Sequence, residues 1–115
     1  MSNPMTKTDK LDQLPEAARD RIQQLRLLFI KRSMEQLSQI RQLLEERTRA
    51  EDPRARDAEL ISLAHSMVGA SGIFGFPDLG NAAFKLENNL REPGYSEADF
   101  LQAADDLIAR LTMVG

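Results

Sequence analysis

Apolar side chains recur at three- and four-residue steps along most of the chain, which is the spacing of one face of an α-helix. Between Pro15 and Arg49 this face is formed by Ile22, Leu25, Phe29, Gln36, Ile40 and Leu44, widened by Leu37 and Leu43. One helix of that length would be about 50 Å long. We therefore expect a bend or break near residues 20–26 or Ser33, giving a short first helix and a longer second one.

Proline, glycine and capping residues divide the remaining sequence into three more helices. Gly75 is suited to end a helix and Pro77 to begin the next one. Ser96, followed by Asp99 three residues later, is suited to cap a last helix. The expected helices run from about Pro53 to Phe74, from Pro77 to about Arg91, and from Ser96 to about Leu111.

The connections between these helices are short, so neighbouring helices should run antiparallel. No segment has the alternating pattern of a strand, and the sequence contains no internal repeats. We predict an all-α fold, an antiparallel up-down four-helix bundle with an additional short N-terminal helix. Residues 1–13 are polar and are expected to form a flexible N-terminus, with residues 14–115 as a single helical domain.

Composition limits the classes of function that fit. The 115 residues include 42% apolar and 29% charged residues, the balance of an ordinary globular domain. A net charge of −3 gives no sign of nucleic-acid binding, and the longest apolar run, residues 27–30, is too short for membrane insertion. The absence of cysteine agrees with a cytoplasmic location. No further face is strongly apolar, so we expect a monomer.

His65 is the only histidine and the main candidate for chemistry. On a helical wheel it lies opposite the expected core face, so its imidazole should face outward. A neutral imidazole offers a lone pair near neutral pH, which suits an exposed phosphoryl carrier. The residues that share the core face are Leu60, Leu63, Ala64, Met67, Ala70 and Phe74.

Small residues surround His65 on the wheel. Each glycine inside a helix costs about 1 kcal/mol relative to alanine, yet Gly69 and Gly72 both lie in this helix. A side chain at position 69 would lean over His65, so glycine there leaves the imidazole accessible to a partner. The alternative is that both glycines allow another helix to pack closely. Ile61, Ser62, Val68 and Gly72 share the face of His65 and are the expected partner-binding residues.

The run AHSMVGASGIFGFP at residues 64–77, followed by LGNAAFKLE at residues 79–87, resembles the histidine-containing phosphotransfer (HPt) domains of bacterial multistep phosphorelays. This resemblance implies that His65 accepts the phosphoryl group and that Gly69 gives access to it. Glu87 matches a position where family members often place Gln or Glu to bind the ring nitrogen that is not phosphorylated. The alternative for Glu87 is an ordinary exposed helix acid.

The sequence departs from the family pattern at Val68. Many members have Lys or Arg three residues after the histidine, where a positive charge can meet the phosphoryl oxygens. Lys85 is the nearest candidate on the next helix, but it lies about 200° from Glu87 on the wheel, so we do not expect it to compensate.

The resemblance implies a phosphorelay carrier, not a turnover enzyme. Its expected partners are response-regulator receiver domains and a hybrid sensor histidine kinase. No cofactor is expected in this chain, and Mg²⁺ is expected on the receiver. Two alternatives remain open: a module of the same fold that binds a receiver or kinase without transferring phosphate, and an unrelated helical adaptor in which His65 is incidental.

Overall fold

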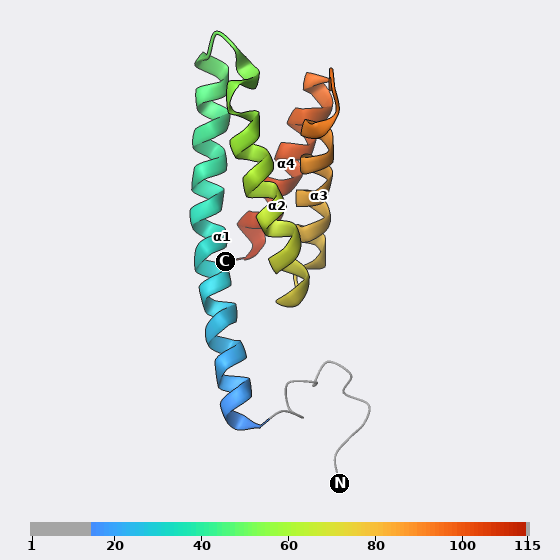
Figure 1. Cartoon of the computed structure of the whole chain (residues 1–115). Helices are drawn as coiled ribbons and strands as arrows, with labels where there is room; N and C mark the ends of the chain where they lie inside the picture. The colour runs from blue at the N-terminus through green and yellow to red at the C-terminus, as the bar shows by residue number, and fades with distance from the viewer. Residues whose placement is uncertain (1–14, 115) are drawn as a thin grey trace.

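The computed structural model describes residues 15–114, and within them it contains helices and no strand. The predicted all-α class and antiparallel bundle are confirmed (Figure 1). None of the described helices is long and apolar enough to cross a membrane. The flexible segment predicted for residues 1–13 lies outside the described residues. The elements are α1 (Glu16–Arg49), the 3-10 helix η2 (Pro53–Arg56), α2 (Asp57–Ile73), α3 (Pro77–Arg91) and α4 (Glu97–Val114).

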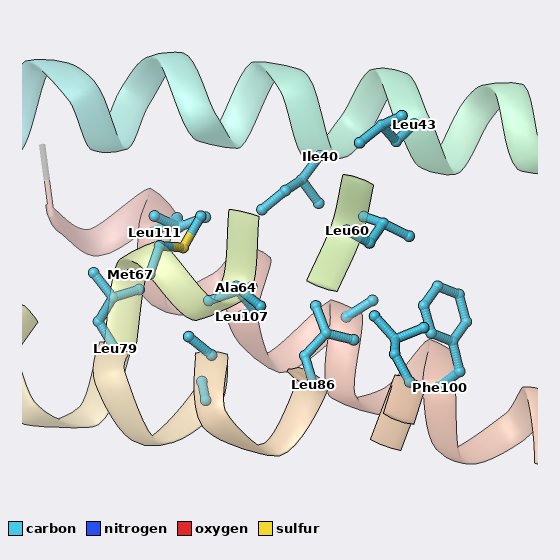
Figure 2. Packing of buried hydrophobic residues seen from close by; sticks show 14 of the residues in the cluster. Ile40, Leu43, Leu60, Ala64, Met67, Leu79, Leu86, Phe100, Leu107 and Leu111 are labelled. Atoms are coloured by element: carbon cyan, nitrogen blue, oxygen red, sulfur yellow. The ribbon is translucent and has the colours of Figure 1, made fainter. Parts of the chain in front are cut away.

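The four α-helices close a bundle around one apolar core. Helix α2 packs against α3, α3 against α4 and α4 against α1, while α1 also contacts α2. Each helix contributes side chains that point toward the others in the interior (Figure 2). Among the most deeply buried are Ile40, Leu60, Met67, Leu86, Phe100, Leu107 and Leu111.

The break predicted in the first helical segment is wrong. Helix α1 continues from Glu16 to Arg49, and its first turns extend beyond the ends of the other helices (Figure 1). The sequence between Pro15 and Pro53 contains no glycine or proline that would interrupt it. The hydroxyl of Ser33 is buried and donates to the carbonyl of Phe29 at 2.9 Å, so this serine bonds within the helix. The expected short N-terminal helix is therefore part of α1.

The helix expected to begin at Pro53 is divided. Residues Pro53–Arg56 form the tighter η2, and the α-helix starts only at Asp57. The Asp52 carboxylate accepts a hydrogen bond from the Arg54 amide at 3.0 Å, which fixes the entry into η2. Short 3-10 turns are frequent at the N-termini of α-helices and as connectors between segments.

The ends of the other helices follow the local signals closely. Gly75 has a φ of 84°, the left-handed conformation that glycine adopts without a steric penalty. The Phe76 amide then donates to the carbonyl of Ser71 at 2.8 Å, closing the end of α2. At the start of α4, the hydroxyl of Ser96 accepts a hydrogen bond from the Asp99 amide at 3.2 Å. The predicted cap of the last helix is confirmed.

Gly80, which was not singled out from the sequence, sets the approach of α2 and α3. A methyl group added at Gly80 would lie 3.3 Å from Cβ of the buried Ser71 and 3.8 Å from the carbonyl oxygen of Val68. These distances leave little room for a side chain at position 80. The two helices that carry His65 and Glu87 can therefore lie close together.

A buried arginine of α1 connects several segments at one end of the bundle. The side chain of Arg47 is 4% exposed. Its guanidinium donates to the Asp57 carboxylate at 2.6 Å, to the Tyr95 hydroxyl at 2.8 Å and to the Glu97 carboxylate at 2.7 Å. It also donates to the carbonyl of Pro53 at 2.8 Å. One side chain of α1 thus connects η2 and the first turns of α2 and α4.

Candidate functional site

His65 lies in the middle of α2 on the side away from the core, as its place on the wheel predicts. Its side chain is 71% exposed. On the opposite face of the helix, Leu60, Ala64, Met67 and Ser71 are buried. The imidazole is therefore fixed to a rigid, well-packed helix while its ring reaches solvent.

The ring of His65 contacts a carboxylate on the neighbouring helix. Nδ1 of His65 lies 2.9 Å from Oε2 of Glu87, although the two residues are 22 positions apart in the sequence. The Glu87 side chain is only 9% exposed. Glu87 is thus not the exposed helix acid of the alternative interpretation, since its carboxylate is enclosed and directed at the histidine.

Arg91, which the sequence reasoning did not single out, holds the same carboxylate. Its Nε donates to Oε2 of Glu87 at 3.0 Å, and its Nη2 lies 2.9 Å from that oxygen. Burial would raise the pKa of Glu87, but the hydrogen bonds from Arg91 and His65 hold it below its ordinary value. The signal in the sequence was the Glu–Arg spacing of four residues, which places both side chains on one helix face.

An ionised carboxylate can only accept hydrogen bonds. The contact between Glu87 and the ring therefore requires the proton of the neutral imidazole to be on Nδ1 of His65. The other nitrogen, Nε2, keeps its lone pair. The arrangement yields an exposed nucleophile of fixed tautomer, with a negative charge behind it that favours positive charge on the ring.

The glycines beside His65 do not serve close packing within the chain. A methyl group added at Gly69 or at Gly72 would meet no atom within 4 Å. Both positions are exposed. The packing alternative therefore finds no support in the contacts of these two glycines, and the helix surface next to the imidazole is low and open.

The four expected partner-binding residues differ in accessibility. Ser62 and Gly72 are exposed, whereas Ile61 and Val68 are half-buried and pack against the core. The apolar surface beside His65 is thus smaller than the wheel suggests, because both apolar side chains pack partly against the core.

Lys85 does not lie beside His65. It lines a hollow between α3 and α4 together with Asp106 and Arg110. This place, on the α4 side of α3, agrees with the expectation that Lys85 does not supply the positive charge that is missing at position 68.

Comparison with known proteins identifies the family. The sequence model of the Hpt domain matches residues 24–113, from within α1 to the last turn of α4. No curated protein and no solved structure matches the chain significantly. The match covers most of the chain, including the exposed histidine of α2 and the carboxylate that binds it. The chain belongs to the Hpt domain family, whose members are phosphoryl carriers of phosphorelays.

Proposed function

We propose that this chain accepts a phosphoryl group on Nε2 of His65 from the aspartate of a receiver domain and donates it to another. The observation that carries the proposal is the 2.9 Å hydrogen bond between Nδ1 of His65 and the buried Glu87. It leaves the exposed nitrogen unprotonated, and that is the atom a partner can reach.

In the transfer step, the lone pair of Nε2 attacks the phosphorus of the aspartyl phosphate. The N–P bond forms as the P–O bond breaks, and the electron pair of that bond leaves with the aspartate carboxylate. The proton on Nδ1 stays in place, so positive charge develops on the ring, where the Glu87 carboxylate stabilises it. The reverse step returns the phosphoryl group to an aspartate. In this proposal the Mg²⁺ that neutralises the phosphoryl oxygens belongs to the receiver.

The partners in this proposal are receiver domains of response regulators and of a hybrid sensor histidine kinase. A receiver would approach over the low surface of Gly69 and Gly72 and contact Ser62 and the accessible parts of Ile61 and Val68. Small helical residues allow the backbone of a partner to come close to the imidazole. In this proposal the carrier acts as a monomer.

A second candidate function is favoured by one observation. Val68 stands where many family members have a cation, and Lys85 lies on the α3–α4 side. A phosphoryl group on His65 would thus have fewer positive neighbours than in those members. In this alternative the chain binds a receiver or kinase as an adaptor or inhibitor and transfers nothing.

The two functions are separated by mixing the purified chain with a phosphorylated receiver and measuring the intact mass of both proteins. We expect the chain to gain one phosphoryl group and to lose it after acid treatment, because phosphohistidine is acid-labile. Binding with no mass gain, tested over receivers from the same genome, would favour the binding-only module.

Changing Gly69 to leucine should slow transfer while leaving the fold intact. The new side chain would lean over His65, and misplacing reacting groups by about 1 Å can cost about a hundredfold in rate. Apart from the neighbouring backbone of its own helix, the added Cβ would have no atom within 4 Å. The free energy of unfolding should therefore stay the same or rise by up to about 1 kcal/mol, since glycine is a poor helix former.

The measurement for Gly69→Leu is the rate of mass gain from a phosphorylated receiver, with urea denaturation in parallel. Gly69→Ala is the matched control, because its single methyl group does not reach the ring. If the leucine variant accepted phosphate as fast as the wild type, access to the imidazole would not depend on this glycine.

A further inference from the structure

One oxygen of Glu87 accepts hydrogen bonds both from His65 on α2 and from Arg91 in the last turn of α3. Oε2 accepts from Nδ1 of His65 at 2.9 Å and from Nε of Arg91 at 3.0 Å, and Nη2 of Arg91 lies 2.9 Å from it. Arg91 is 55% exposed and Glu87 9%. The guanidinium thus covers the solvent side of a carboxylate that is otherwise enclosed.

The tautomer of His65 depends on the placement of the Glu87 carboxylate. Held against the ring, this carboxylate accepts the proton of Nδ1. If the carboxylate turned away, the neutral ring would also populate the tautomer with its proton on Nε2. In that tautomer Nε2 has no lone pair for attack. The group that holds the Glu87 carboxylate against the ring therefore favours Nε2 as the nucleophile.

We propose that Arg91 is a positioning residue for His65: its guanidinium orients the enclosed Glu87 carboxylate toward the ring, which holds the ring proton on Nδ1 and leaves Nε2 free. The effect of Arg91 on the rate of transfer rests on the proposed function. Its effect on the tautomer of His65 does not, because that concerns the unphosphorylated protein. The contacts described for Arg91 are with Glu87 and not with the imidazole, so it acts through Glu87.

The placement of Arg91 fits this role. It lies four residues after Glu87 in the last turn of α3, where a positive charge also interacts favourably with the helix dipole. Its planar guanidinium can direct two N–H groups at one carboxylate oxygen, which the single ammonium of lysine does less well. The pair Glu87–Arg91 is neutral overall, so the site gains an acceptor for Nδ1 without adding net negative charge behind a phosphoryl group.

The test uses ¹⁵N NMR of the imidazole in the full chain. His65 is the only histidine, so both imidazole nitrogen signals belong to it. At alkaline pH, where histidine is neutral, the wild type should show a protonated Nδ1 and an unprotonated Nε2. In Arg91→Met we expect the Nε2 signal to move toward that of a protonated nitrogen. Arg110→Met removes the same charge from α4 and should leave both signals unchanged.

The rate of phosphoryl transfer provides the second readout. Removing a group that orients a reacting side chain through another residue costs about 10–100-fold in metal sites, and we expect a loss of about tenfold for Arg91→Met. Arg91→Lys should recover part of it. Ring signals in Arg91→Met identical to those of the wild type would overturn the proposal. If the signals move but the wild type accepts no phosphate, the positioning role stands and the proposed function fails.

Discussion

Replacing His65 by glutamine should abolish phosphorylation of this chain by any receiver. Glutamine fills a similar volume and can still bond to Glu87, but its amide has no nucleophilic lone pair comparable to that of Nε2. No second histidine and no cysteine exists in the sequence to take over the reaction. We expect the mass gain seen with the wild type to disappear completely, measured on the intact chain after incubation with a phosphorylated receiver.

Two controls make the His65→Gln result specific. The variant should unfold at the same urea concentration as the wild type within error, because the side chain is 71% exposed. Ser66→Ala changes the neighbouring exposed residue and should transfer normally. A phosphoryl group that persists in His65→Gln and survives acid would lie on a hydroxyl, and the proposed carrier role of His65 would be wrong.

Local signals in the sequence were sufficient for most helix boundaries. Pro77 begins α3, Gly75 adopts the left-handed conformation that closes α2, and Ser96 caps α4. Each of these features depends on a few adjacent residues, so a pattern in the sequence specifies it fully. The break expected in α1 had no such local signal. It was inferred from helix length alone, and no proline or glycine is present to produce it.

The candidate site was predictable in part. The wheel gave the outward direction of His65, but only the family resemblance paired it with Glu87, because contacts between helices depend on their register and not on either helix alone. The partial burial of Val68 was not predicted, because it depends on how the helices pack together. Arg91 was missed although its spacing from Glu87 was visible, since an exposed ion pair on a helix is commonplace.

The buried cluster that Arg47 forms with Asp57, Tyr95 and Glu97 could not be predicted from local patterns at all. Its carboxylate partners, Asp57 and Glu97, lie 10 and 50 residues away along the chain, and Arg47 looks like one more basic residue of a solvated helix face. In the structure its guanidinium also lies over the ring of Phe100, 4.0 Å from the ring centre. Burial alone would lower the pKa of Arg47, yet its hydrogen bonds to Glu97, Tyr95 and Asp57 raise it above the ordinary value.

Replacing Arg47 by methionine should be the most destabilising of the changes considered. Methionine keeps the apolar stem but leaves the Asp57 carboxylate, 15% exposed, without its cation. Breaking a buried pair from one side costs about 3–5 kcal/mol. We expect about 3 kcal/mol, the lower end, because Glu97 is 52% exposed and can turn to water. Small domains have only about 5–15 kcal/mol of stability, so the shift in a urea titration should be large.

Arg49→Met is the matched control for this loss of charge. Arg49 lies two residues further along α1, is 73% exposed and pairs only with the exposed Glu45 in the described contacts. Exposed ion pairs of this kind contribute about 0–1 kcal/mol, so the control should unfold close to the wild type. If Arg47→Met were as stable as Arg49→Met, the cluster would not be what holds η2 and the starts of α2 and α4 to α1. A large difference would mean that the helix carrying His65 depends on a contact at its far end for its place in the bundle.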